Sequence, residues 1–158
     1  MSEAGKKPSI TPLPPLVYMA GIAVSLILHA FYPLPWFNSP FSDILVGAGW
    51  LCLLGFAALF YTAVRTMMRA RTTINPNATP DHLVTGGPFS ITRNPIYLAD
   101  TLLLIGVGLI SGIAWFLVLA IVCAFITQKI AIEREEKILL EKFGKRFHDY
   151  SKRVRRWI

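Results

Sequence analysis

The chain has 158 residues, of which 54% are hydrophobic and 16% are charged, and its formal net charge is +7. Soluble domains carry about 25% charged residues. Here long uncharged stretches separate the charged ones, which predicts a polytopic membrane protein. The basic residues flank apolar runs, so the positive charge indicates membrane topology and excludes nucleic-acid binding.

The first half of the chain predicts a leader and two membrane helices. Residues 1–15 are polar and proline-rich, and we expect a flexible leader. Apolar runs follow at residues 16–32 and at about 41–66, joined by a loop whose prolines and aromatic residues suit the headgroup zone. The second run contains small residues, among them Gly47 and Gly49, that allow helices to approach closely.

The second half predicts a polar loop and a short helical hairpin. Prolines at positions 76, 80 and 88 prevent a continuous helix through residues 65–93. The run 95–110 corresponds to roughly 22–24 Å of helix at about 1.5 Å per residue, which is short for an apolar core of about 30 Å. Ser111-Gly112 separates it from a fourth run, 113–132. The hairpin therefore either just crosses the bilayer or turns within it.

After the fourth run we expect a charged amphipathic helix that continues without a breaker from Glu133 to the C-terminus. The fold class is thus all-α, a membrane helix bundle with four apolar segments. Ten of the sixteen basic residues lie from Lys129 onward, and neither the first loop nor the hairpin turn contains any. This bias places both termini and the long loop in the cytosol.

The third helix opens with a cluster of polar residues. Pro95 suits the first helical turn and Asn94 the N-cap. A helix N-terminus beside Arg93 attracts a carboxylate or phosphate, and Tyr97 lies one turn further on. The alternative is an ordinary cap with an arginine that extends to the membrane surface.

Acidic residues accompany this cluster. Asp100 lies at i+3 from Tyr97, and an acid within a membrane helix is a candidate functional group. Its alternative is a hydrogen bond to Tyr97 or to loop amides at headgroup level. Glu133 and Glu136 share a helix face, and so do Lys129 and Glu133 at i,i+4. The alternative for this helix is a solvated surface on anionic lipid.

The loop before the third helix has the composition of a small-molecule pocket. Leu83, Val84 and Phe89 supply apolar walls, while Gly86 and Gly87 expose backbone N–H groups. Irregular backbone near a membrane must be buried in protein or line a cavity. The alternative is a plain cytosolic connector. The three histidines and two cysteines show no metal-ligand spacing, so we predict no metal site.

Three segments, "TTINP", "HLVTGGPFSITRNPIYLAD" and "EREEKILLEKFGKRFHDYSKRVRRWI", resemble the isoprenylcysteine carboxyl methyltransferase and phospholipid methyltransferase families. The resemblance extends from about Arg65 to the C-terminus and is closest to small bacterial members. It implies one membrane domain, residues 1–158, that uses S-adenosylmethionine and releases S-adenosylhomocysteine. The cofactor pocket would form in residues 67–158, from the loop, the hairpin and the C-terminal helix.

The residues carried over from the resemblance combine with those chosen from the chemistry. The expected cofactor contacts are His82, Leu83, Val84, Gly87, Phe89, Asn94, Pro95, Ile96, Tyr97, Glu133 and Glu136. Glu133, Arg93 and Tyr97 are expected to be catalytic, and Lys129, Asp100 and Arg153 to bind substrate. Asn94 stands where many members have histidine, and Lys129 lies near a family arginine whose planar fork a lysine lacks.

The expected reaction transfers a methyl group from S-adenosylmethionine to a carboxylate, amine or thiol of a lipid-like acceptor. The expected location is a bacterial inner membrane, with the site facing the cytosol. One alternative is a non-catalytic scaffold or lipid-binding protein with the same fold. Another is a lipid-reducing enzyme that uses a nicotinamide cofactor. The sequence leaves the acceptor and the oligomeric state open.

Overall fold

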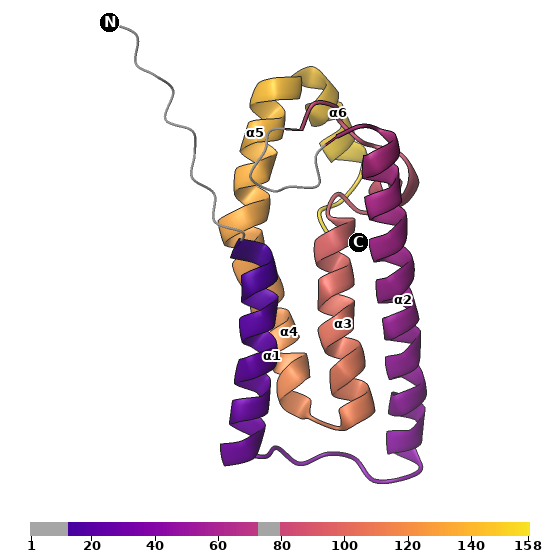
Figure 1. The fold of residues 1–158 in the computed structure, drawn as a ribbon, viewed down its shortest axis with the longest axis vertical. Coiled ribbons are helices and arrows are strands. Elements are labelled where there is room, and N and C mark those ends of the chain that lie inside the picture. Colours follow the sequence, from indigo (N-terminus) through magenta and orange to yellow (C-terminus); the bar gives the residue numbers. More distant parts are fainter. Residues whose placement is uncertain (1–12, 73–79) are drawn as a thin grey trace, which may run out of the picture.

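The computed structural model describes residues 13–72 and 80–158, and this part of the chain is all-helical, as predicted. The apolar helices α1 (Leu13–Phe31), α2 (Phe41–Arg69), α3 (Pro95–Ser111) and α4 (Ala114–Thr127) run along the long axis of the molecule (Figure 1). Helix α1, helix α2 and the continuous helix Ala114–Phe143 are long and apolar enough to cross a membrane, whereas α3 has 17 residues. The protein is therefore an integral membrane protein.

Two predicted boundaries differ from the structure. Helix α1 begins at Leu13 rather than Leu16, because prolines 14 and 15 lie in its first turn, where proline needs no N–H partner. The predicted leader is thus too long by three residues, and its first twelve lie outside the described residues. Helix α2 continues to Arg69, past the predicted end at Thr66. Pro76 and most of the "TTINP" segment also lie outside the described residues.

The predicted break at Ser111-Gly112 is confirmed. Gly112 adopts a left-handed conformation (φ 71°) and its N–H donates to Gly108 O at 3.0 Å, which ends α3. Since only glycine accepts this conformation without strain, Gly112 sets the hairpin. The α3–α4 turn lies at the same end of the bundle as the α1–α2 connection (Figure 1). These are the two connections that contain no basic residue.

Helices α2 and α3 pack closely through glycine. A Cβ atom on Gly49 would lie 2.9 Å from Gly106 O, and one on Gly106 would lie 3.0 Å from Gly49 O. Any side chain at either position would force the two backbones apart. By contrast, nothing lies within 4 Å of a Cβ on Gly47. Of the two predicted contact glycines, Gly49 therefore serves this interface and Gly47 does not.

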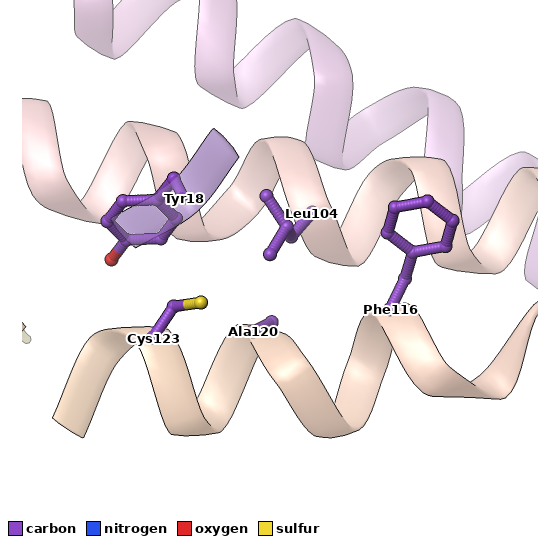
Figure 2. Close-up of a cluster of buried hydrophobic side chains, with 5 residues drawn as sticks. All are labelled: Tyr18, Leu104, Phe116, Ala120 and Cys123. Carbon is purple, nitrogen blue, oxygen red and sulfur yellow. The ribbon is translucent and has the colours of Figure 1, made fainter. Parts of the chain in front are cut away.

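The core of the bundle lies between α1, α3 and α4. Tyr18, Leu104, Phe116, Ala120 and Cys123 form a buried cluster (Figure 2). The Cys123 thiol lies 3.5 Å from Val17 O, to which it donates a weak hydrogen bond. If Gly21 of α1 carried a Cβ atom, that atom would lie 2.6 Å from the Cys123 sulfur, which is too close. A cysteine and a glycine thus allow α1 and α4 to approach each other.

Beyond α4 the helix changes its winding and then breaks. A π-helical turn, η2 (Gln128–Ile132), leads into α5 (Glu133–Phe143) without interruption. The prediction of one helix to the C-terminus is wrong, because Gly144 (φ 52°) ends α5 and the chain reverses into α6 (Lys145–Arg153). The remaining residues, 154–158, return toward the start of α3, and we call them the C-terminal strap. The reversal brings the end of the chain to the polar end of the bundle.

Candidate functional site

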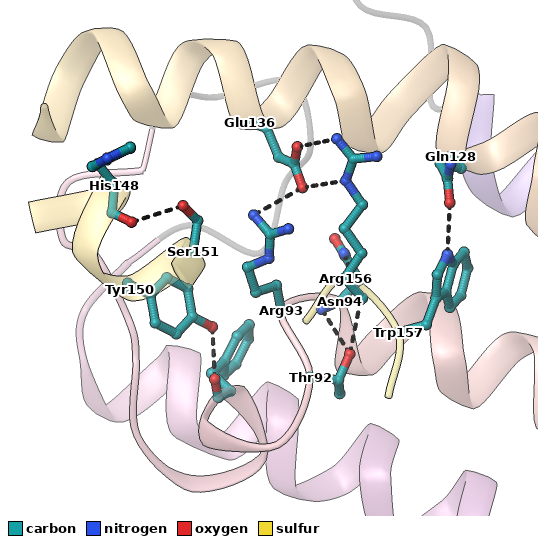
Figure 3. A network of polar contacts seen from close by, with 11 residues as sticks. Thr92, Arg93, Asn94, Gln128, Glu136, His148, Tyr150, Ser151, Arg156 and Trp157 are labelled. Carbon is teal, nitrogen blue, oxygen red and sulfur yellow. Dashed lines mark hydrogen bonds and ion pairs between the residues drawn. The ribbon is translucent and has the colours of Figure 1, made fainter. Parts of the chain in front are cut away.

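Arg93, two residues before α3, belongs to a charged cluster whose centre is Glu136. Arg93 Nη1 lies 3.1 Å from Glu136 Oε1, and Arg156 of the C-terminal strap binds the same carboxylate through Nε at 2.9 Å and Nη2 at 2.7 Å (Figure 3). Glu136 therefore lies between two guanidinium groups. Its hydrogen bonds raise the pKa of Arg156 above the usual range. With two cations and one anion, the cluster keeps a net positive charge.

The C-terminal strap is bound to the turn that opens α3. Arg93 N donates to Arg155 O at 2.9 Å. Thr92 Oγ1 and Asn94 Nδ2 donate to Arg156 O at 3.0 and 2.9 Å (Figure 3). Asn94 occupies the predicted N-cap position, but its side chain makes no capping hydrogen bond. Its amide holds the strap instead.

The strap also contacts the π-helical turn, since Trp157 Nε1 donates to Gln128 Oε1 at 2.8 Å (Figure 3). The residues immediately before α3 and the end of α4 are thus connected through the last residues of the chain. Nothing in the sequence pattern links the strap to residues 92–94, because every one of these bonds joins positions far apart in the chain.

A second contact joins α3 to α5. The Tyr97 hydroxyl donates to Glu135 Oε1 at 2.5 Å. Helix α5, in which seven of eleven residues are charged, lies beyond the apolar span. Burial raises the pKa of the Glu135 carboxyl, and the bond from Tyr97 opposes this shift. A half-buried acid with a raised pKa that accepts a hydrogen bond from a tyrosine on a neighbouring helix is a candidate functional group.

Glu135 was missed at the level of sequence, although a signal was present. It lies at i+3 from Ile132 and at i−4 from Leu139, so it falls on the apolar side of its helix. An acid at such a position must be buried or paired. Because its neighbours Arg134 and Glu136 are also charged, Glu135 did not stand out in the sequence.

The loop before α3 is held by α2 and α6. Gly87 has φ 58°, and a Cβ there would lie 3.0 Å from Thr66 Oγ1. Phe89 O accepts a hydrogen bond of 2.6 Å from the Tyr150 hydroxyl, and burial raises the pKa of Tyr150 to about 12. Leu83 packs against the buried cluster of Phe147, Tyr150 and Val154. These contacts hold the loop against α2 and α6, while Gly86, Gly87 and Ser90 stay exposed.

The other predicted site residues divide into two groups. Pro95 is buried and Ile96, Asp100 and Val84 are half-buried around the start of α3 and its loop. His82 and Arg153 are exposed, and Lys129 forms an exposed ion pair of 2.8 Å with Glu133, four residues further along the helix. That bond lowers the pKa of Glu133. The structure thus brings Arg93 to Glu136 and Tyr97 to Glu135, but it directs Glu133 toward Lys129.

The charged cluster has unused hydrogen-bonding capacity. The Arg93 side chain is 13% exposed, and its buried Nε atom has no hydrogen-bond acceptor among the described residues. A buried N–H donor is rarely left without a hydrogen-bond acceptor. A carboxylate or hydroxyl oxygen of a ligand would fit there, beside the positive end of α3. In residues 13–72 and 80–158 no three His, Cys, Asp or Glu side chains gather as metal ligands.

A family model described as phospholipid methyltransferase matches residues 44–146, which include α3, α4, α5 and most of α2. The match contains both the Arg93–Tyr97 turn and the Glu135–Glu136 pair that faces it. Neither a curated protein nor a solved structure matches the chain.

Proposed function

The chain belongs to the phospholipid methyltransferase family and is therefore a membrane methyltransferase of lipid-related substrates, and from this premise we propose where its reaction takes place. The methyl donor is S-adenosylmethionine and the acceptor is an amphipathic molecule. The site lies between the start of α3, the loop 82–89 and α5. The observation that supports this proposal is the pair of contacts between the start of α3 and α5, namely the ion pair of Arg93 with Glu136 and the hydrogen bond from Tyr97 to Glu135.

The residues at this place fit the cofactor's charges. Its amino-acid carboxylate would bind the N-terminus of α3 and Arg93 Nε, which has no partner within residues 13–72 and 80–158. Its cationic portion would lie near the Glu135 and Glu136 carboxylates and the ring of Tyr97. When bound, S-adenosylmethionine supplies an electrophilic methyl group. The protein's own contribution is to position the acceptor and exclude water.

The orientation of the site follows from charge. The basic residues gather at the end of the bundle that contains α5, α6 and the strap, which supports a cytosolic location for this end. The water-soluble cofactor then arrives from the cytosol, while the acceptor arrives from the bilayer between helices. A bacterial inner membrane suits this arrangement.

Binding of S-adenosylhomocysteine to the purified full-length protein in detergent tests the proposal. We expect calorimetry to give a measurable affinity, and Arg93→Gln to weaken it by about tenfold or more, because a charged hydrogen bond is lost. Arg69→Gln is the matched control, since Arg69 is an exposed arginine at the end of α2. Equal affinity of both variants, or binding of NADPH in place of S-adenosylhomocysteine, contradicts the proposal.

A further inference from the structure

A groove of about 460 Å³ lies on α2 at the polar end of the bundle. The described residues that line it belong to the last turns of this helix, namely Tyr61, Val64, Arg65, Met68 and Arg69, and we call it the α2 groove. Helix α2 stands at the edge of the bundle and packs mainly against α3 (Figure 1). Ala63, which is fully buried, lies about 200° around the helix from Tyr61 and from Arg65. The α2 groove therefore opens outward, away from the protein interior.

The charges of α2 place the groove at the surface of the membrane. The 21 residues between Asp43 and Arg65 contain no charged side chain. At about 1.5 Å per residue, Asp43 and Arg65 are roughly 33 Å apart, which is close to the thickness of an apolar core of about 30 Å. These two residues thus mark the two surfaces of the membrane. Arg65 and Arg69 lie at the level of the lipid headgroups, on the side of α5 and α6.

The two guanidinium groups of the α2 groove have no counter-ion in the described structure. Arg65 and Arg69 are exposed, and neither forms an ion pair with an acid within residues 13–72 and 80–158. Like charges one helical turn apart repel each other. Arg65 Cζ lies 5.9 Å from the centroid of the Tyr61 ring, an attractive arrangement that keeps this guanidinium on the groove. An anion bound between the two arginines would relieve their repulsion.

Apolar surface continues from the α2 groove toward the middle of the membrane. Trp50, Leu54, Ala57 and Tyr61 follow one another at spacings of four, three and four residues, so they lie on one side of α2. All four are exposed. The small side chain of Ala57 leaves space between the larger side chains of Leu54 and Tyr61. This apolar stripe is a surface along which an acyl chain can lie.

We propose that the α2 groove binds one anionic phospholipid, which stays with the protein and does not react. Its phosphate lies between the guanidinium groups of Arg65 and Arg69, whose planar forks suit phosphate oxygens. One acyl chain runs along the apolar stripe from Tyr61 to Trp50. The negative surface potential of the cytosolic leaflet attracts basic residues, which agrees with a cytosolic location for this end of the bundle. Because the groove opens outward on α2, this lipid is distinct from the methyl acceptor, and the inference does not depend on the proposed function.

A second copy of the chain fits the α2 groove less well than a lipid does. Two copies in one membrane have the same orientation, so a symmetric contact through this side of α2 would place Arg65 and Arg69 of both copies at the same depth. Four guanidinium groups would then lie close together. The only acid of α2 is Asp43, at the other end of the helix, so no carboxylate of α2 could pair with them. The charges therefore favour a lipid phosphate.

Native mass spectrometry of the full-length protein, released from detergent micelles, counts the lipids that stay bound. The probes are phosphatidylglycerol and phosphatidylcholine with identical acyl chains, because both contain the phosphate but only the first has a net negative charge. We expect one retained phosphatidylglycerol per chain and weaker retention of phosphatidylcholine. Equal retention of the two lipids overturns the proposal. Displacement of phosphatidylglycerol by inorganic phosphate also overturns it, because the site would then recognise the anion without its lipid chains.

Removal of single charges tests the position of the site. Arg65→Gln should weaken retention of phosphatidylglycerol by about tenfold, because a charged contact with the phosphate is lost, and the double variant with Arg69→Gln should abolish it. Arg146→Gln is the matched control, since it removes an exposed arginine of α6 at the same end of the bundle. Equal losses in Arg65→Gln and Arg146→Gln contradict the proposal, because retention would then depend on net charge alone.

The same spectra distinguish the lipid from a second copy of the chain. A lipid-free dimer of the parent that becomes monomeric in Leu54→Ala would assign the groove to a second copy and overturn the proposal. The arginine variants should keep the parent's affinity for S-adenosylhomocysteine, because the groove opens away from the proposed reaction site. A parent protein that retains phosphatidylglycerol but does not bind the nucleoside supports the lipid site and refutes the proposed function, so the two failures are distinguishable.

Discussion

The Glu136 carboxylate is shared by Arg93 and Arg156, at 3.1 Å from the first and 2.7 Å from the second. Glu136 on α5 thereby connects Arg93, in the turn before α3, to Arg156 of the C-terminal strap. The Glu136 side chain is 17% exposed, so water screens these contacts only in part. This shared carboxylate holds α5, the turn before α3 and the C-terminal strap together at the polar end of the bundle.

Glu136→Gln should lower the stability of the protein. The change leaves two guanidinium groups next to each other without their anion, and removing one partner of a buried ion pair costs about 3–5 kcal/mol. Because Arg156 is 38% exposed, we expect roughly 1–3 kcal/mol here. Thermal unfolding in detergent measures it. The exposed Glu141 of the same helix provides the control, and Glu141→Gln should unfold close to the parent. Similar losses in both variants would show that the shared carboxylate contributes no specific stability.

Glu135 should give the protein a distinct pH dependence. Burial raises its pKa in the folded state above the ordinary value of 4.5, so the folded chain holds this proton at higher pH than the unfolded chain does. The resulting stabilisation is complete below the unfolded pKa and is lost as pH rises through the folded pKa. Glu135→Gln lacks this titration, so its stability relative to the parent should increase from pH 4 to pH 8. A difference between the two proteins that does not change with pH would contradict the assignment.

The helical register after the π-helical turn should determine which acids face α3. A helix has about 3.6 residues per turn, so inserting one alanine between Glu133 and Arg134, beyond that turn, rotates everything after it by about 100°. Glu135 and Glu136 would then turn away from Tyr97 and Arg93, and we expect binding of S-adenosylhomocysteine to be lost. Deleting Ala131 is the contrasting variant, because a π-helical turn that loses one residue becomes an α-helical turn and the helix after it keeps its orientation. If the insertion variant binds like the parent, the acids do not need this orientation.

The glycine contact between α2 and α3 should be sensitive to a single methyl group. In Gly106→Ala the new Cβ would lie 2.8 Å from Leu53 Cδ2 and 3.0 Å from Gly49 O. Overpacking of this kind costs about 1–3 kcal/mol. Gly47→Ala on α2 adds the same group in open space and should be neutral or stabilising, because alanine favours helices by up to about 1 kcal/mol. Chemical unfolding in detergent compares the two, and an equal effect would exclude a close contact.

The local features of the molecule were determined by the sequence itself. The apolar helices, the break at Gly112 and the ion pair of Lys129 with Glu133 depend on composition, on one glycine and on i,i+4 spacing. Each involves residues that are neighbours in the chain, so periodicity and turn chemistry suffice to predict them. The position of Arg93, Asn94 and Tyr97 at the start of α3 was predicted in the same way.

The tertiary structure alone decided which side chains meet. The sequence pointed to Glu133 and Glu136, but after the π-helical turn it is Glu135 and Glu136 that contact Tyr97 and Arg93, while Glu133 pairs with Lys129. The reversal at Gly144 ended the predicted helix and brought Arg156 back to Glu136. A change of one residue in helical winding, or one reversal of the chain, alters every contact that follows it, and these contacts join residues far apart in sequence. Only the folded chain determines such contacts.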